Sequence, residues 1–325
     1  MKAQKIKKIG VLTSGGDAPG MNAAIRAVVR TGVYHGVEVV GIMKGYVGLI
    51  ENEMQTLTAR DVSDTLQRGG TILQTARCLE FKKPEGVKKA CRTAKAQGID
   101  GLIVIGGDGS FRGAMDLCKE GLPTIAMPGT IDNDISCSEY TIGYDTCLNT
   151  VIEAVDKIRD TATSHNRCSI IEVMGRNAGY IALEAGIACG AEVILVPEKE
   201  WDFDKDVLST VLESKARGKK HSIIIVAEGI GGVMEMAKQI EEKTGIETRA
   251  TILGYVQRGG NPTVRDRIIA SEMGAKSVEL LLEGKQNRIV RVKDGKVSDV
   301  DIAEGLAMKK TLPESLDSIV NKLTV

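Results

Sequence analysis

Short apolar runs alternate with longer helical patterns along the chain, and this alternation constrains the fold more than any other sequence feature. The runs "GLIVI" at 101–105 and "SIIIVA" at 222–227 lack the polar–apolar alternation of a half-exposed strand, which indicates strands buried on both faces. Such strands, separated by helices, imply right-handed crossovers and a doubly wound α/β architecture with mostly parallel sheets.

The expected elements follow from this pattern, with boundaries set by glycine and proline. We expect strands at 8–13, 37–43, 101–105, 123–127, 169–174, 193–196, 222–227 and 250–255. We expect helices at 22–34, 84–97, 113–119, 147–161, 178–187 and 270–282. The 325 residues suffice for two domains, although no low-complexity linker marks a boundary between them.

The composition excludes several classes of partner. The 43 basic and 43 acidic residues balance, so no global field attracts nucleic acid or an anionic membrane. The seven cysteines are scattered, with no C-x-x-C pair, which is typical of a reducing compartment. No apolar run approaches the length of a signal peptide core or a membrane span. We therefore expect a cytoplasmic protein.

Six expected strands end in loops rich in glycine and charged residues. In chain order these loops are "SGGDAPGMN", "GGDGSFRG", "PGTIDND", "MGRNAG", "AEGIGG" and "VQRGGNP". Ligands of open α/β sheets bind beyond the carboxyl ends of the strands. Glycines let backbone N–H groups approach phosphate oxygens closely, and a following helix N-terminus favours negative charge. We expect the six loops to converge on one edge and bind a phosphorylated ligand.

The chemistry expected there is phosphoryl transfer. The chain has no G-x-x-x-x-G-K-[ST], no G-x-G-x-x-G, no H-E-x-x-H and no G-x-S-x-G, and only three histidines. Carboxylates and arginines remain, and phosphoryl transfer uses a carboxylate-held metal, cationic donors and a base. On this reasoning Asp108 holds Mg²⁺, Asp132 or Asp134 is the base, and three arginines neutralise phosphate: Arg77, Arg176 and Arg258. A solvated Asp/Asn turn is the alternative for "PGTIDND" taken alone.

Together, these motifs resemble the bacterial ATP-dependent 6-phosphofructokinases over roughly residues 6 to 310. The resemblance is carried, in order, by "GVLTSGGDAPGMNAAIR", "IGGDGS", "PGTIDND", "TIGYDT", "DKIRDTATSHNR", "EVMGRNAG" and the pattern "QRGG.PT..DR". "PGTIDND" is specific to that family, whereas "GGDG" also occurs in lipid and NAD kinases. The expected reaction is transfer from Mg-ATP to the 1-hydroxyl of fructose 6-phosphate.

The resemblance also implies roles for individual residues. Asp132 matches the base, Thr130 contacts the reacting phosphoryl region, Asp134 supports the site, and Asp108 is the Mg²⁺-linked aspartate. The nucleotide contacts are matched by Gly16, Tyr46, Arg77, Cys78, Lys82, Gly107, Asp108, Gly109 and Ser110. The substrate site is matched by Ile131, Met174, Gly175, Arg176, Glu228, Tyr255 and Arg258, with Arg167 and Arg249 supplied by a neighbouring subunit.

A second anion site is expected from basic residues outside these loops. Arg26 and Arg30 are four apart and share a helix face, and "RGKKH" at 217–221 precedes a strand. A solvated loop is the alternative for that basic run. The resemblance implies an effector site between subunits of a homotetramer, for ADP or phosphoenolpyruvate. It is matched by Arg26, Arg30, Arg159, Gly190, Glu192, Arg217, Lys219, Lys220 and His221.

Departures and rivals refine the expectation. Position 255 is tyrosine where well-known members have histidine, and Ala59 stands where some have an effector-site arginine. Pyrophosphate-dependent members carry Asp and Lys where this chain has Gly109 and Gly129, so ATP is favoured. A non-catalytic nucleotide sensor is the rival outside enzymes, and it would need no base.

The family predicts an ATP-binding domain at 1–143 with 258–306 and a substrate-binding domain at 144–257 with 307–325.

Overall fold

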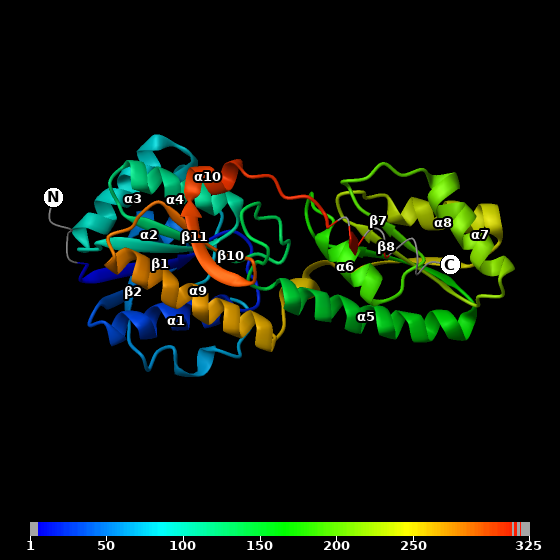
Figure 1. The fold of residues 1–325 in the computed structure, drawn as a ribbon, viewed down its shortest axis with the longest axis horizontal. Coiled ribbons are helices and arrows are strands. Elements are labelled where there is room, and N and C mark those ends of the chain that lie inside the picture. The colour runs from blue at the N-terminus through cyan, green and yellow to red at the C-terminus, as the bar shows by residue number, and fades with distance from the viewer. Residues whose placement is uncertain (1–5, 314, 317–318, 320–325) are drawn as a thin grey trace. The chain divides into compact units, whose positions relative to one another are not determined.

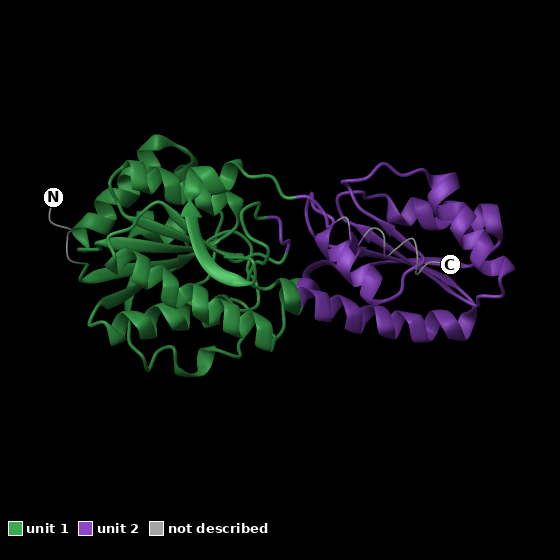
Figure 2. Ribbon diagram, viewed as in Figure 1, with its two compact units in different colours: residues 1–131, 135–146, 258–310 green, residues 132–134, 147–257, 311–325 purple. Residues whose placement is uncertain are grey.

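The computed structural model describes residues 6–313, 315, 316 and 319, and the chain divides into two compact units. Unit 1 comprises residues 1–131, 135–146 and 258–310, and unit 2 comprises 132–134, 147–257 and 311–325 (Figure 2). Residues 314, 317, 318 and 320–325 of the expected second domain lie outside the described residues. The ligand assigned to each domain stays a prediction.

Unit 1 is built on a seven-stranded sheet in its described part. The strand order is β11-β10-β5-β4-β1-β2-β3, with parallel central pairs and an antiparallel strand at each edge. The strands are β1 (Lys8–Thr13), β2 (Glu38–Ile42), β3 (Met54–Leu57), β4 (Gly101–Gly106), β5 (Thr124–Pro128), β10 (Arg288–Lys293) and β11 (Lys296–Asp301). Every residue of β4 and β5 is buried, as their continuous apolar sequence predicts.

Helices cover both faces of this sheet (Figure 1). They are α1 (Met21–Tyr34), α2 (Tyr46–Glu51), α3 (Pro84–Ala96), α4 (Asp108–Lys119), α9 (Val264–Leu282) and α10 (Ile302–Ala307), with short 3₁₀ turns η1 (Ser63–Thr65) and η2 (Glu80–Lys82). Helices α1 and α9 lie side by side, and a Cβ at Gly274 would overlap α1 at Ala24 and Ala27. Glycine at 274 therefore permits their close packing.

Unit 2 is built on a smaller sheet of four parallel strands in the order β7-β8-β6-β9. The strands are β6 (Cys168–Val173), β7 (Val193–Leu195), β8 (Ser222–Ala227) and β9 (Thr248–Ile252). The helices are α5 (Tyr144–His165), which begins in unit 1, α6 (Tyr180–Ala188), the π-helix η3 (Phe203–Leu208), α7 (Ser209–Ala216), α8 (Val233–Thr244) and the 3₁₀ helix η4 (Gly254–Arg258).

The α/β class with two mostly parallel sheets is confirmed. Three expected elements were misplaced, and one of them is the helix expected at 270–282, which begins six residues earlier, at Val264. The strand expected at 250–255 lies at Thr248–Ile252, because Gly254 has a positive φ of 55° and starts η4. The helix expected at 113–119 begins five residues earlier, at Asp108. No described helix is long and apolar enough to cross a membrane.

The sequence pattern also missed several elements, among them β3, the β10–β11 hairpin and α8. The hairpin turns at Asp294 and Gly295, which both have positive φ, so this turn has the Asp-Gly chemistry typical of tight hairpins. The expected convergence of six loops on one edge is wrong. Three follow β1, β4 and β5 in unit 1, and three follow β8, β6 and β9 in unit 2.

Candidate functional site

Three glycine-rich loops meet at one edge of the unit 1 sheet, because β5, β4 and β1 are adjacent and parallel. The backbone N–H of Ser14 donates to the carbonyl of Ile105 at 2.9 Å, and that of Gly129 donates to the carbonyl of Gly106 at 3.0 Å. These two hydrogen bonds connect the loop after β4 to each of its neighbours. The edge therefore has the geometry of a ligand site at the carboxyl ends of parallel strands.

Asp108 is the first residue of α4, directly after Gly107. A side chain added at Gly107 or Gly109 would meet no atom within 4 Å, so the space before this helix is open. The N-terminus of α4 favours negative charge in that space, as in phosphate sites. Ser110 is buried in the first turn, and its backbone N–H donates to the Gly107 carbonyl.

The Asp108 carboxylate is 41% exposed and forms an ion pair with Arg112, one turn later, at 3.1 Å. Among the described residues, no three His, Cys, Asp or Glu side chains form a metal cage. Mg²⁺ is commonly held by one or two carboxylates together with substrate phosphates and waters. An exposed carboxylate at a helix N-terminus fits that kind of Mg²⁺ site.

Tyr46 supports the start of α4 from the core. Its ring stacks on Phe81 with centroids 3.8 Å apart, and its hydroxyl donates to the Ser110 carbonyl at 2.6 Å. Burial raises the pKa of the Tyr46 hydroxyl well above its ordinary value. The ring is thus packed between Phe81 and α4, whereas the other expected contacts in this region, Arg77, Cys78 and Lys82, are exposed or half-buried.

Arg258, expected at the 6-phosphate, lies against the first glycine loop of unit 1. Its guanidinium donates to the Asp17 carbonyl at 3.2 Å, and a Cβ at Gly16 would overlap it. A glycine is therefore needed at position 16 for Arg258 to take this position.

The segment "PGTIDND" leaves β5 at Pro128 and passes from unit 1 to unit 2 between Ile131 and Asp132. Thr141 fixes it by donating its hydroxyl to the Thr130 carbonyl at 2.7 Å. Asp132 is only 7% exposed, and Asp134 is half-buried near Tyr180. The segment is therefore largely buried rather than a solvated turn.

A second group of expected residues meets at the carboxyl end of the unit 2 sheet. Gly175 and Arg176, two and three residues after the end of β6, have positive φ values of 133° and 59°. The Arg176 N–H donates to the Glu228 carboxylate at 2.6 Å. Glu228 follows β8, next to β6. Gln257 accepts a hydrogen bond from the Met174 N–H at 3.1 Å. Met174, Gly175, Arg176 and Glu228 thus lie together at this end of the sheet, and Gln257 supports them.

Arg167 and Arg249 lie at the other end of that sheet. Arg167 immediately precedes β6, and Arg249 is the second residue of β9. The six residues of β6 separate Arg167 from the Met174–Arg176 turn, a distance of roughly 20 Å at the rise of a parallel strand. One small ligand cannot contact both ends within a single unit 2.

Five of the expected effector residues lie together in unit 2. The Lys219 ammonium pairs with the buried Glu192 at 2.5 Å, and Glu192 also accepts the Ile223 N–H. Arg159 contacts the His221 ring at 3.3 Å and donates to the Cys189 carbonyl, which precedes Gly190. Burial, followed by the positive charge of Arg159, lowers the pKa of His221.

The remaining expected effector residues are more dispersed. A pocket of about 350 Å³ is lined by Lys219, Lys220 and His221, together with Arg167. Arg217 is exposed and lies 3.8 Å from Glu213, one turn earlier in the chain. Arg26 and Arg30 lie on α1 of unit 1, where burial and then Arg30 lower the pKa of Arg26. Tyr255 is 83% exposed.

Comparisons with known proteins agree with these features. Residues 8–281 match the family model described as phosphofructokinase. The chain is 57% identical to ATP-dependent 6-phosphofructokinase 1 of Clostridium perfringens, over 98% of this chain and 99% of that protein. It is 56% identical to an ATP-dependent 6-phosphofructokinase of Clostridium botulinum, over 98% and 100%.

Solved structures give the same picture. The phosphofructokinase of Saccharomyces cerevisiae aligns with a TM-score of 0.87 and 36% identity, and the match covers 98% of this chain and 48% of the yeast chain. A pyrophosphate-dependent phosphofructokinase from Marinobacter aquaeolei aligns with a TM-score of 0.85 at 20% identity, over 98% and 92%. The second likeness concerns the fold alone.

Proposed function

The chain belongs to the phosphofructokinase family and converts fructose 6-phosphate to fructose 1,6-bisphosphate with ATP, and we propose that its two units supply different parts of that site. The observation that carries the proposal is the edge of unit 1, where three linked glycine loops surround the open N-terminus of α4. This arrangement suits the phosphates of ATP. The Met174–Arg176 turn with Glu228 suits the polar hydroxyls of a sugar.

Asp132 is the proposed base for the 1-hydroxyl. Its burial and the anchoring of Thr130 by Thr141 hold this carboxylate in a fixed segment. Thr130, Arg77 and Arg176 contact the transferring phosphoryl group, and the two arginines stabilise its charge. Asp108 would hold Mg²⁺, and the ion would supply positive charge that neutralises phosphate oxygens.

The remaining nucleotide and substrate assignments follow the family motif. Gly16, Cys78, Lys82, Gly107, Gly109 and Ser110 serve ATP, and Ile131, Asp134, Tyr255 and Arg258 serve fructose 6-phosphate. The seven free cysteines support a reducing, cytoplasmic location.

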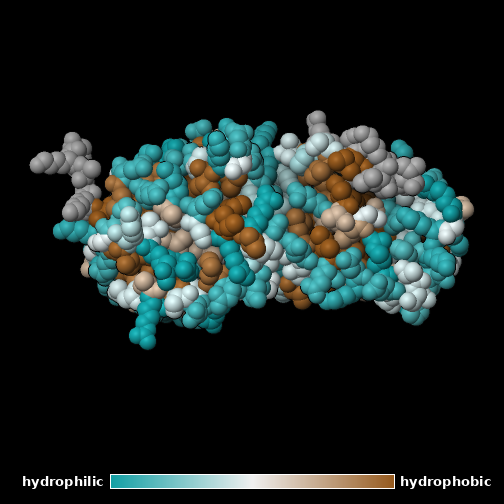
Figure 3. Space-filling model, turned by 60° about the horizontal axis from the view of Figure 1, so that its bottom comes forward, coloured by the Kyte–Doolittle hydropathy of each residue, from teal (hydrophilic) through white to brown (hydrophobic). Residues whose placement is uncertain are grey.

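A second copy of the chain completes the substrate site in this proposal. Arg167 and Arg249 are at the opposite end of the unit 2 sheet from Arg176 and Glu228, so they reach the 6-phosphate of a substrate held by a neighbouring subunit. Apolar side chains exposed on both units support an oligomer, and some reach the surface in Figure 3. Among them are Ile252 (56% exposed) and Val264 (73%). The proposed assembly is a homotetramer.

The basic residues around the pocket of about 350 Å³ form the proposed effector site, for ADP or phosphoenolpyruvate. Lys219, Lys220 and His221 provide donors there, and Arg159, Gly190, Glu192 and Arg217 complete it, with Arg26 and Arg30 from a neighbouring chain. Effectors act on the apparent affinity for fructose 6-phosphate more than on kcat.

Two rivals define the experiment. A pyrophosphate-dependent enzyme would need acidic and basic side chains at positions 109 and 129, and a nucleotide sensor would bind ATP without turnover. The test measures product formation from fructose 6-phosphate with ATP or with pyrophosphate, with and without ADP. Turnover with pyrophosphate alone, or ATP binding without fructose 1,6-bisphosphate, would overturn the proposal.

A further inference from the structure

Glu247 lies between the two arginines assigned to the sugar phosphate. Its Oε2 is 2.7 Å from Arg167 Nε, and its Oε1 is 2.5 Å from Arg249 Nη2. Each carboxylate oxygen therefore serves a different arginine.

The sheet register explains this arrangement. Cys168 of β6 is opposite Thr248 of β9, and the Cys168 N–H donates to the Glu247 carbonyl at 3.0 Å. Arg167 and Glu247, which directly precede these two strands, are therefore neighbours. Arg249 is two residues after Glu247, so its side chain points to the same face.

From this geometry, we propose that Glu247 is a positioning residue that holds Arg167 and Arg249 at one spacing, so that the pair binds the 6-phosphate. The inference rests on the proposed function, because that proposal assigns the two arginines to the phosphate.

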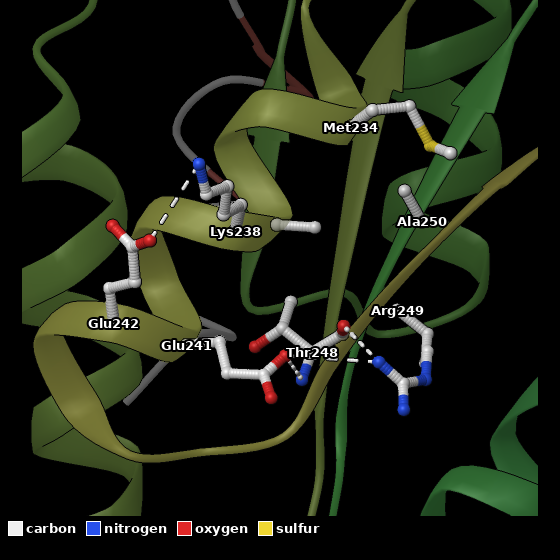
Figure 4. Close-up of a pocket in the computed structure, with 8 residues that line it drawn as sticks. Met234, Lys238, Glu241, Glu242, Thr248, Arg249 and Ala250 are labelled. Carbon is white, nitrogen blue, oxygen red and sulfur yellow. Dashed lines mark hydrogen bonds and ion pairs between the residues drawn. The ribbon is translucent and has the colours of Figure 1, made fainter.

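Both guanidinium groups keep donors for a ligand. Among the described residues, the Nη nitrogens of Arg167 and the Nε of Arg249 make no hydrogen bond or ion pair. Arg249 Nη1 makes only long contacts, 3.5 Å to the Thr248 carbonyl and 3.8 Å to Glu241 (Figure 4). Glu247 alone leaves a net charge of +1 on the two guanidinium groups, and Glu241 is a second, more distant carboxylate, 3.8 Å from Arg249. Glu247 therefore orients the pair without neutralising it.

The test is the half-saturating concentration of fructose 6-phosphate in Glu247→Gln. A glutamine keeps the shape but offers one acceptor oxygen, and its amide group points donors at the other arginine. We expect that concentration to rise about three- to tenfold, as for the loss of one partly exposed charged contact. The kcat and the KM for ATP should stay unchanged within about twofold. Glu247→Asp keeps both oxygens and should recover part of the loss.

Glu241→Gln is the matched control. It removes an equal charge that is 3.8 Å from the same arginine, but Glu241 has no ion pair with Arg167, so fructose 6-phosphate saturation should not move. An equal shift in both variants would mean that only the general field changed and would overturn the inference. Unchanged kcat and sedimentation in Glu247→Gln would show that the variant is folded and assembled.

Arg167→Ala and Arg249→Ala separate this inference from the proposed function. If neither alters fructose 6-phosphate saturation, the assignment of the arginines is wrong and the inference falls with it. If both weaken it but Glu247→Gln has no effect, or tightens binding, the arginines bind phosphate and Glu247 does not position them. In an Arg167→Ala/Arg249→Ala background, Glu247→Gln should have no further effect.

Discussion

Hybrid oligomers test directly whether the substrate site is shared between chains. One parent chain carries Arg167→Ala and Arg249→Ala, and the other carries Arg176→Asn. Asparagine is chosen because position 176 has a φ of 59°, which asparagine tolerates better than most residues. Co-expression with two different tags and purification on both isolates hybrids that contain each kind of chain.

The expected recovery follows from the geometry of unit 2. Removing two charge-assisted contacts of ~1.5–3 kcal/mol each lowers kcat/KM of the first parent by ~10²–10⁴-fold. If a site combines the Arg176 turn of one chain with Arg167 and Arg249 of its neighbour, random mixing gives about one quarter of sites with both parts intact. The hybrids should then show about one quarter of the wild-type kcat/KM.

A hybrid of wild-type chains with the Arg167→Ala/Arg249→Ala chain is the control for assembly, and about half of its sites should be intact in either model. The reasoning would be refuted if the hybrids of the two variant chains were no more active than their parents while the control hybrid kept one half of the wild-type activity. It would mean that the two ends of β6 act within one chain.

Three further predictions concern the base, the phosphate donor and the effector. Asp132→Ser should lower kcat by ~10²–10⁴-fold in an ADP-release assay, because a general base is lost; near-normal turnover would pass the role to Asp134. Gly109→Asp should fold normally, since its Cβ meets no atom within 4 Å. It should raise the KM for ATP by tenfold or more, because a carboxylate beside phosphate costs ~1.4 kcal/mol of binding free energy or more. Gly109→Ala is its control and should bind ATP nearly as wild type, whereas equal loss in both would point to packing. Burial and Arg159 lower the pKa of His221, so its ring is neutral at pH 7 and gains a proton only below its usual range. A bound anion stabilises the protonated ring, so inhibition by phosphoenolpyruvate should strengthen as the pH falls below ~6.5. In Arg217→Ala this inhibition should be weak at every pH. Fructose 6-phosphate saturation curves measure both effects. Inhibition that is independent of pH would contradict the role of His221.

Local sequence was sufficient to select Asp108, Asp132 and Arg176 as candidates, because each follows an expected strand in a short glycine-rich segment. Tyr46, Arg167 and Arg249 lie outside such segments and were implied only by the family resemblance. The Gly107–Asp108 pair, for example, had to precede a helix for its glycine to expose backbone donors. The same reasoning wrongly placed all six glycine-rich loops at one sheet edge, since the sequence of a loop does not encode which sheet its strand joins. The order β7-β8-β6-β9 depends on long-range pairing that no single segment specifies.

Residues that act through register were also missed. Glu247 and Gln257 look like ordinary polar residues in the sequence. Glu247 acquires a role only because β6 and β9 are aligned so that it lies beside Arg167. Gln257 acquires one only because η4 brings it to Met174. The burial of Tyr46 against Phe81 is likewise a tertiary contact between segments 35 residues apart. Such roles can be recognised only in the folded structure, where the strands are paired and the layers packed, whereas turn residues can be recognised from the local sequence.

The position of Arg167 gives the proposed regulation a physical route. This residue lines the pocket of about 350 Å³ together with Lys219 and His221, and it also forms the Glu247 pair. An anion bound in that pocket would attract the Arg167 guanidinium. It would so compete with the sugar phosphate that we propose the same guanidinium contacts in the neighbouring chain. Because the contact that we propose for Arg167 is with the 6-phosphate and not with the reacting 1-hydroxyl, the coupling should alter binding and leave the chemical step unchanged. A typical coupling of ~1–3 kcal/mol would shift the apparent affinity ~5- to 150-fold, and Ala59, which supplies no effector-site arginine, favours the lower end.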